Sequence, residues 1–364
     1  MLLIVIATIP LLIWIYLLIG RGGFWRISKN LAPKNFVVTA GPRVVAVIPA
    51  RNEEAVLGET LRSLQVQTFA TVVVDDGSTD ATAAVARAAG VKIISASSPP
   101  PGWTGKLWAL SLGVEEALKL HPDYLLFTDA DIRHEPQNVA SLLSLAEHRN
   151  LDLCSYMVKL CCDTWAEKAF IPAFVYFFFT LYPPAWAGGA AGGCLLIRPQ
   201  ALASIGGLAA IRGEIIDDCA LARAVKARGG RIWLGLTKTT ASIRSYGGIR
   251  GVRAMIARNA FSQLRHSPLL LAGTTAGLLI TYVVPVALVL FGSGWPRILG
   301  AIAWLLMSAS YLPMVRFYRR SWLWSVLLPF IALFYLECTI ASARAYWGGA
   351  GGEWKGRAQD RTAP

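Results

Sequence analysis

Two patterns of hydrophobic residues divide this chain. One is a set of long uncharged or nearly uncharged runs, at residues 2–19, 269–291, 298–315 and 322–341. Each approaches the ~20 apolar residues that a bilayer-spanning helix needs. The other pattern, between the first and second runs, is a series of short apolar runs that alternate with amphipathic segments. The sequence therefore predicts a soluble domain attached to four membrane helices.

The first long run is expected to remain as an anchor, because it lacks the basic start and the small-residue cleavage site of a signal peptide. The expected division of the chain is an N-terminal anchor (1–20), a cytoplasmic domain (30–266), three further membrane helices (267–346) and a polar tail (347–364). Positive charge sets the orientation, since cytoplasmic loops are rich in Lys and Arg. Such residues follow the first run and separate the last two: Arg21, Arg26, Lys29, Lys34, Arg316, Arg319 and Arg320.

Within the expected cytoplasmic domain, β-branched runs alternate with helical patterns. The order is strand 44–48, helix 56–64, strand 72–74, a helix from Thr79 or Asp80 to Gly90, strand 91–94, helix 106–120 and strand 124–127. This alternation predicts an α/β fold with a largely parallel sheet. In such sheets, ligands bind beyond the carboxyl ends of the strands.

Composition agrees with a membrane protein. Hydrophobic residues make up 55%, charged residues 16%, and mean hydropathy is +0.49. The net charge of +13 suits anionic lipid headgroups, a phosphate-bearing substrate or nucleic acid. Nucleic acid is disfavoured, because the chain has neither zinc-finger spacing nor a basic helical run. Six cysteines without a CxxC pair indicate neither a zinc site nor a disulfide framework.

Polar, mostly acidic segments follow three of the expected strands. They are "PARNEE" after strand 44–48, "DDGSTD" after strand 72–74 and "DAD" after strand 124–127. Such residues are common in turns, but their coincidence at one edge favours a site. If the strand continues through Asp129 and Asp131, both carboxylates share a face. Two unpaired carboxylates repel, and a hard divalent cation removes that repulsion. We therefore expect a metal that contacts a diphosphate.

Two further segments carry candidate chemistry. Lys106, in "PPGWTGKLWAL", lies at a turn before a helix, where its charge and the helix N-terminus suit phosphate. The segment has no Walker A pattern, and no GxGxxG follows the first strand, so an ATPase or dinucleotide dehydrogenase is disfavoured. Asp217 and Asp218 open an expected helix that ends at Gly229 and Gly230. They either favour the helix dipole or supply a general base for a hydroxyl nucleophile.

The ordered set "VIPARNEE", "VVVDDGSTD", "GKLWAL", "TDAD" and "IIDDCALA" resembles family 2 glycosyltransferases of the GT-A fold, over most of residues 43–240. "PPGWTGKLWAL", "AFIPAFVYFFF", "AGGCLLIR" and "IDDCALA" further resemble hopanoid-biosynthesis-associated glycosyltransferases. The resemblance implies a bacterial inner-membrane enzyme that uses a nucleotide-diphosphate sugar, most simply a UDP-sugar, with Mg²⁺ or Mn²⁺.

The resemblance also implies roles for individual residues. Nucleotide-sugar binding falls on Pro49, Ala50, Arg51, Glu53, Asp75, Asp76, Lys106 and Asp129, and the metal on Asp129 and Asp131. Asp218 falls on the catalytic base, and Asp217 replaces the glutamate that usually precedes it. The Q-x-x-R-W motif of processive synthases is missing, since Gln263 and Arg265 have the wrong spacing. A single transfer is therefore expected.

The expected acceptor is a lipid, which a segment at 169–182 would deliver. This segment is too short to span a membrane, contains Pro172 and is followed by Pro183 and Pro184, so it is expected to be broken and either interfacial or a buried core helix. Hopanoid, ceramide, glycerolipid and polyprenyl phosphate remain open as acceptors. A nucleotide-sensing domain on a membrane protein is the alternative without catalysis. Glu337, the acid within the expected membrane helices, is expected near the interface.

Overall fold

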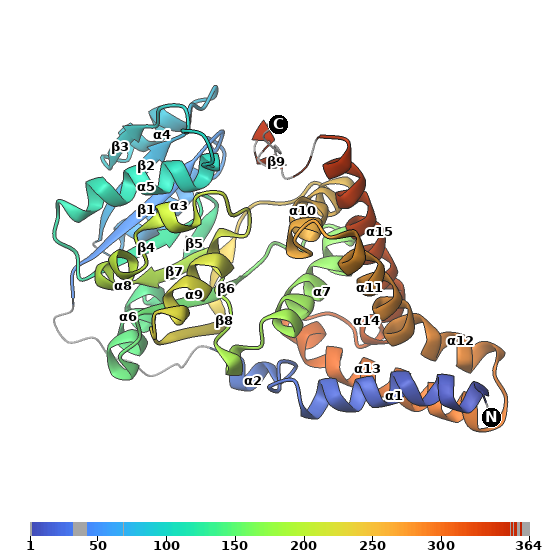
Figure 1. Ribbon diagram of the computed structural model, residues 1–364. Helices are drawn as coiled ribbons and strands as arrows, with labels where there is room; N and C mark the ends of the chain where they lie inside the picture. The colour runs from blue at the N-terminus through green and yellow to red at the C-terminus, as the bar shows by residue number, and fades with distance from the viewer. Residues whose placement is uncertain are drawn as a thin grey trace.

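A computed structural model of the chain describes residues 2–31, 42–67, 69–349, 351, 353–354 and 357–358. Lys34 and most of the expected polar tail lie outside the described residues. An α/β domain occupies one side of the molecule and a bundle of long helices the other (Figure 1). Two short strands, β9 (Glu353–Trp354) and β10 (Arg357–Ala358), pair near the C-terminus.

The α/β domain is built on one mixed sheet. Its strands are β1 (Val44–Ala50), β2 (Ala70–Asp75), β3 (Lys92–Ser95), β4 (Tyr124–Thr128), β5 (Ile132–His134), β6 (Leu153–Lys159), β7 (Cys194–Ile197) and β8 (Ile232–Ser242). Their order is β3-β2-β1-β4-β7-β6-β8-β5. Neighbours are parallel except at β7 and β5, which run antiparallel to the strands beside them. The expected largely parallel sheet is confirmed, and its strands and helices begin within a few residues of the predicted positions.

Helices cover both faces of this sheet. One face carries α3 (Leu57–Gln65), α4 (Thr82–Ala88) and α6 (Asn138–Arg149), and the other α5 (Gly105–Leu118), α8 (Pro199–Ser204), the 3₁₀ turn η2 (Leu208–Ile211) and α9 (Asp217–Ala227). Successive strand residues face opposite sides, so Val45 and Val47 of β1 join the core under α5, whereas Ala46 and Ile48 join the core under α3 and α6. Both sets are fully buried, which explains why the strands read as continuous apolar runs.

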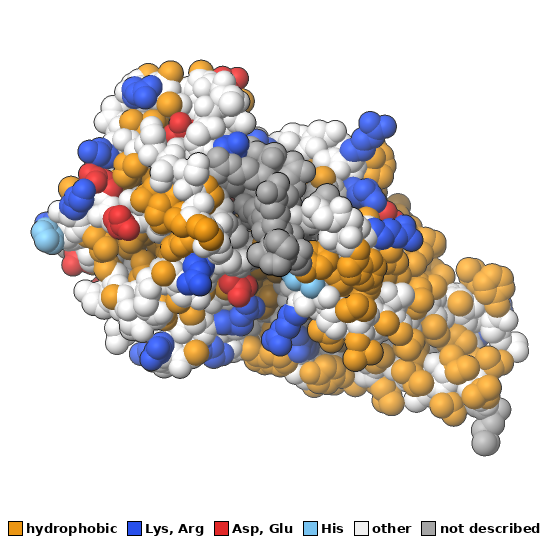
Figure 2. Space-filling model, turned by 45° about the horizontal axis from the view of Figure 1, so that its top comes forward, with side chains coloured by type: hydrophobic (Ala, Val, Ile, Leu, Met, Phe, Trp, Pro, Cys, Tyr) orange, Lys and Arg blue, Asp and Glu red, His pale blue; other side chains and the backbone are white. Residues whose placement is uncertain are grey.

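The helical region contains the apolar runs. Its elements are α1 (Leu2–Ile19), α2 (Ile27–Asn30), α7 (Trp165–Leu181) with the 3₁₀ turn η1 (Pro184–Trp186), α10 (Ile249–Gln263), α11 (Pro268–Leu278), the π-helical segment η3 (Leu279–Val283), α12 (Val284–Phe291), α13 (Gly294–Phe317), α14 (Leu323–Val326) and α15 (Leu328–Trp347). Among the described residues, five helical segments are long and apolar enough to cross a membrane: 2–19, 165–186, 268–291, 294–317 and 328–347. Figure 2 shows hydrophobic side chains covering much of this region, whereas charged ones are scattered over the domain.

The helix α7 was not expected among these candidates, and Pro172 does not break it. Proline removes one hydrogen bond, but packing holds the helix together, as Tyr176 is buried and its hydroxyl hydrogen-bonds Ser310 at 2.7 Å. The chain leaves β6 before α7 and returns in β7, and these strands pair in one sheet. The chain therefore enters and leaves this helix from the same domain. The helix packs with α1 and α13 in a shared hydrophobic cluster.

Close packing of α5 on the sheet depends on Gly113. A Cβ atom at this position would lie 2.3 Å from Val47 Cγ1 and 2.8 Å from Val74 Cγ2, both in buried strands. Only glycine lets the helix approach this closely, and the same helix carries Lys106 in its first turn.

We predict that Gly113→Ala lowers the free energy of unfolding by roughly 1–3 kcal/mol, because the core must shift to accept the methyl group. The helical Gly58 in α3 is the matched control, since a Cβ there meets its nearest atoms at 3.5 Å. Gly58→Ala should be neutral or stabilise by about 0.5–1 kcal/mol. Denaturant unfolding of the purified full chain, followed by tryptophan fluorescence, measures both; equal effects would contradict the packing argument.

Candidate active site

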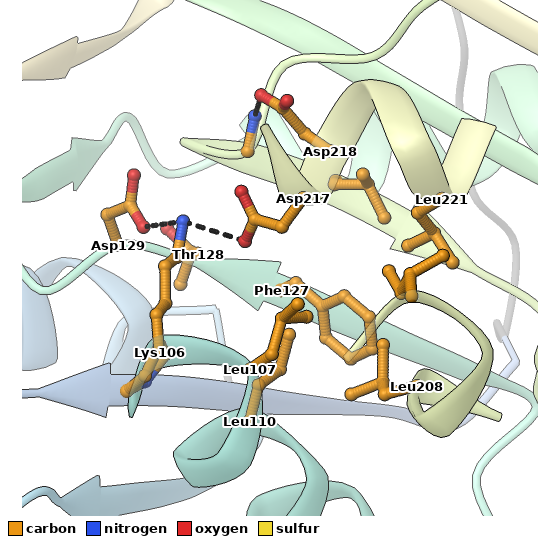
Figure 3. A pocket seen from close by; sticks show the side chains of 14 residues that line it. Lys106, Leu107, Leu110, Phe127, Thr128, Asp129, Leu208, Asp217, Asp218 and Leu221 are labelled. Atoms are coloured by element: carbon orange, nitrogen blue, oxygen red, sulfur yellow. Dashed lines mark hydrogen bonds and ion pairs between the residues drawn. The ribbon is translucent and has the colours of Figure 1, made fainter. Parts of the chain in front are cut away.

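The predicted polar segments converge where β1, β2 and β4 end, at the carboxyl edge of the sheet. Four charged side chains from three segments form a compact cluster there (Figure 3). Lys106 comes from the start of α5, Asp129 from the loop after β4, and Asp217 and Asp218 from the first turn of α9. Pro49 of β1 lines the same cavity.

Lys106 is the counter-charge of this acid cluster. Its Nζ lies 3.2 Å from Asp129 Oδ1 and 3.1 Å from Asp217 Oδ2. Burial alone would lower the pKa of Lys106, but the carboxylates of Asp129, Asp217 and Asp218 outweigh burial and raise this pKa. The lysine therefore stays charged at any physiological pH. The Asp129 carboxylate is 39% exposed, so the cluster opens to solvent on this side.

Asp218 is held differently from its neighbour. Its Oδ2 accepts a hydrogen bond from Gly192 N at 2.8 Å, and its Oδ1 accepts one from Cys219 N at 2.7 Å. It forms no direct ion pair among the described residues. Burial, followed by the charge of Asp217, raises the pKa of Asp218 to about 6, although Lys106 acts in the opposite direction. This carboxylate can therefore gain or lose a proton near neutral pH.

The strand β4 does not continue through Asp129 and Asp131, so the condition under which both carboxylates would share a face is not met. The strand ends at Thr128, and a turn closed by a hydrogen bond from Ile132 N to Asp129 O leads into β5. The two carboxylates consequently have different partners. Asp129 faces Lys106, whereas Asp131 accepts a hydrogen bond from Ser242 Oγ at 2.8 Å and lies 3.5 Å from Arg244 Nε.

Arg244, which sequence patterns did not indicate, links two of the predicted segments. Besides Asp131, it forms an ion pair with Glu53, which is buried in the first loop. Glu53 is also held through its backbone N, which donates to Thr82 Oγ1 at 2.7 Å. The arginine is an isolated basic residue in the loop after β8, so no motif could have identified it.

The second loop is organised by its own acids. Asp76 forms an ion pair with Arg51 at 3.7 Å, and the Arg51 guanidinium also donates to Asp76 O. Asp75 accepts a hydrogen bond from Ser78 N at 3.1 Å, which closes the turn after β2. Both aspartates are buried. The first and second loops are joined by a hydrogen bond from Asp76 N to Ala50 O at 2.9 Å.

A buried polar network supports the turn that carries Asp129 and Asp131. Thr128 Oγ1 donates to Gly193 O at 2.8 Å and lies 3.0 Å from His134 Nε2, while Asn138 Nδ2 lies 3.2 Å from His134 Nδ1. Because the threonine proton is used, His134 Nε2 donates to Thr128 and Nδ1 accepts from Asn138. Burial lowers the pKa of His134 to about 4, so the ring is neutral. Sequence patterns did not indicate this histidine.

The donor set suits a hard divalent cation. Carboxylate oxygens are the ligands that Mg²⁺ and Mn²⁺ prefer, and Mg²⁺ sites often use one or two carboxylates together with substrate phosphates. Within the described residues, no group of three or more His, Cys, Asp or Glu side chains is placed to hold a metal alone. The exposed Asp129 carboxylate therefore fits a site that a phosphate-bearing ligand completes. The Oδ2 atom of Asp131 is already in contact with Ser242 and Arg244.

Comparison with known proteins agrees with this architecture. The fold is of the GT-A type: a mannosyltransferase from Pyrobaculum calidifontis, solved in complex with GDP-Man and Mn²⁺, superimposes with a TM-score of 0.53 at 17% identity, covering 94% of this chain and 98% of that one. Residues 45–206 match the model of the family Glycosyl transferase family 2. The matched segment includes Pro49 to Asp131 and ends before Asp217.

Two curated relatives match a shorter part. An uncharacterised protein of Methanocaldococcus jannaschii is 38% identical over 101 residues, which are 28% of this chain and 40% of that protein. The 4,4'-diaponeurosporenoate glycosyltransferase of Staphylococcus haemolyticus is 39% identical over 93 residues, which are 24% of each chain. The chain thus matches less than half the length of either relative.

We predict that Lys106→Gln destabilises the fold increasingly as pH rises. Without the ammonium, the pKa of Asp218, which burial and the charge of Asp217 already raise, rises further above its unfolded value. A carboxyl group whose pKa is higher in the folded than in the unfolded chain lowers the free energy of unfolding once the pH exceeds its unfolded pKa. This loss grows with pH until the folded pKa is passed. The loss at about pH 8 should be larger than at about pH 5. The loss of stability should stay below the roughly 3–5 kcal/mol that breaking a fully buried ion pair costs, because solvent reaches the cluster.

Melting temperatures of wild type and variant across this pH range test the prediction. The matched control is Lys119→Gln, which removes an exposed pair between Lys119 and Glu116 at 2.6 Å. The control should change little at any pH. A Lys106→Gln loss that does not depend on pH would contradict the charge-compensation account.

Proposed function

We propose that the chain is a membrane-bound, inverting glycosyltransferase that moves a sugar from a nucleotide-diphosphate sugar to a hydroxyl group of a lipid. The observation that carries the proposal is the cluster of Lys106, Asp129, Asp217 and Asp218 at the carboxyl edge of a GT-A sheet. Glycosyl transfer needs positive charge near a leaving diphosphate and a base near the attacking hydroxyl. The cluster supplies both, with Lys106 as the positive charge and a carboxylate as the base.

The donor diphosphate is proposed to lie on the exposed side of the cluster, against Asp129 and Lys106. A divalent cation held by Asp129, and by Asp131 once released from Arg244, would stabilise the negative charge of the leaving diphosphate. Mn²⁺ in the Pyrobaculum structure supports this choice of metal. The nucleotide would lie over the first and second loops, where Pro49, Ala50, Arg51, Glu53, Asp75 and Asp76 are proposed to position it.

Asp218 is proposed as the general base. Its carboxylate takes the proton of the acceptor hydroxyl while the oxygen attacks the anomeric carbon, and the bond from this carbon to the diphosphate oxygen breaks. Two backbone N–H groups fix the orientation of Asp218, which has no competing ion pair among the described residues. Asp217 is paired to Lys106 and is proposed to keep the ammonium in place.

A lipid acceptor is supported by the position of the domain on a bundle of apolar helices. The basic residues at the ends of α1 and α13 support a cytoplasmic domain. A bacterial inner membrane is proposed on the sequence resemblance. A hopanoid is proposed as the acceptor on the sequence resemblance alone. Ceramide, glycerolipid and polyprenyl phosphate are distinguished from it by identifying the glycolipid that a deletion strain loses.

We predict that Asp218→Asn reduces kcat by about 10²–10⁴-fold, the usual contribution of a general base, while donor affinity changes little. The substitution keeps shape but removes the ability to accept a proton. Turnover is measured with extracted lipid acceptor and mass spectrometry, and donor binding by calorimetry. Asp217→Asn is the matched control and should retain a pH-dependent activity.

The pH dependence of kcat provides a second readout of the same assignment. Because Asp218 must be ionised to accept a proton, activity should rise with pH through about 6 and level off above it. An Asp218→Asn enzyme with turnover near that of wild type, or a wild-type profile without this step, would refute the assignment.

A further inference from the structure

A second cavity, of about 600 Å³, lies where the first membrane helix meets the domain. Its walls come from the end of α1, the turn into α2, the end of α6, the loop after α7 and the start of β8. The register across the sheet pairs Ile232 with Leu153, Leu153 with Ile197, and Ile197 with Leu125. The cavity therefore adjoins the edge where β4 begins, opposite to the edge where Asp129 lies.

The charged side chains that line this cavity are all basic. Arg26 and Lys29 come from α2 and its start, and Arg149 is the last residue of α6. No Asp or Glu lines the cavity, and none of the three forms an ion pair among the described residues. Arg21 provides a contrast, because its Nε donates to Thr180 O at 2.9 Å and its guanidinium lies 4.5 Å from the Trp186 ring centroid. Arg21 thus holds two protein segments together, whereas the three cavity cations are exposed. Arg26 lies over the ring of the adjacent Trp25, 5.2 Å from its centroid, and this contact joins no distant segment.

The apolar part of the cavity continues from the membrane. Leu18 and Ile19 are the last residues of α1, an uncharged helix of spanning length, and both line the cavity. Trp233 lines it from the domain side, and tryptophan is enriched at the level of lipid headgroups. One cavity thus joins an apolar wall, continuous with a membrane helix, to three positive charges.

We infer that this cavity binds an anionic phospholipid, with the lipid phosphate between Arg26, Lys29 and Arg149 and an acyl chain along the end of α1. Three cations that surround a phosphate give charge-assisted hydrogen bonds, and arginine matches its geometry in particular. The volume lies within the roughly 300–1,000 Å³ of ligand sites. A free phosphate ion shares the headgroup chemistry but cannot use Leu18 and Ile19. The inference does not depend on the proposed transferase reaction, because it concerns a different edge of the sheet.

The test is native mass spectrometry of the full chain in detergent, titrated with phosphatidylglycerol or phosphatidylcholine. The wild-type protein should retain phosphatidylglycerol in preference to phosphatidylcholine. The triple variant Arg26→Gln, Lys29→Gln, Arg149→Gln should lose affinity by about tenfold or more, since each cation near an anionic lipid surface contributes about fivefold. The control variant Arg62→Gln, Arg87→Gln, Arg228→Gln changes the net charge equally at exposed positions outside the cavity and should bind as wild type does.

The outcomes distinguish a bound phospholipid from soluble phosphate. Phosphatidylglycerol binding that survives in the triple variant, or equal retention of both lipids by wild type, would overturn the inference. Displacement of the lipid by an equal concentration of inorganic phosphate would show that the cavity takes soluble phosphate instead. If the triple variant fails to fold, Arg149→Gln alone, on the surface of the domain, should weaken phosphatidylglycerol binding by about fivefold.

Discussion

The candidate site depends on one electrostatic constraint, the compensation of three neighbouring carboxylates by the ammonium of Lys106. Asp129, Asp217 and Asp218 come from two segments far apart in the chain, and their charges would repel without this cation. The lysine is in place because α5 lies close against the sheet at Gly113. A diphosphate brings further negative charge to the cluster. The proposed donor would therefore need a cation to bind here, which is the physical reason for the proposed metal.

Local pattern predicted most of the fold and part of the site. Alternating apolar runs located the strands from β1 to β4 and the helices between them, because burial on both faces gives continuous β-branched segments. The acids at the strand ends followed from the same pattern. Arg244 and His134 could not be predicted, since their contacts join segments distant in the chain and neither residue belongs to a motif. Pattern alone left open whether the strand continues through Asp129 and Asp131, and the structure has a turn there, set by local hydrogen bonding.

The domain and the apolar helices are packed together rather than joined by a linker. Residues of β6, β8, α1, α7 and α13 share one hydrophobic cluster. Arg320, in the segment after α13, donates to Cys162 O at 3.1 Å, and Arg253 of α10 forms a bidentate pair with Glu337 of α15. Glu337 is thus neutralised by a partner that periodicity could not identify. Packing also explains why α7 continues through Pro172, where sequence alone predicts a break.

The most direct test of the account is calorimetric binding of nucleotide-diphosphate sugars to the purified full chain, with and without Mn²⁺. UDP- and GDP-sugars should be compared, since the nucleotide is open. The account predicts that one donor binds with Mn²⁺, that binding is lost when the ion is chelated, and that Asp129→Asn weakens it strongly. Folded protein that takes up no activated sugar, or that binds one equally well without the ion and without the Asp129 carboxylate, would contradict the central claim.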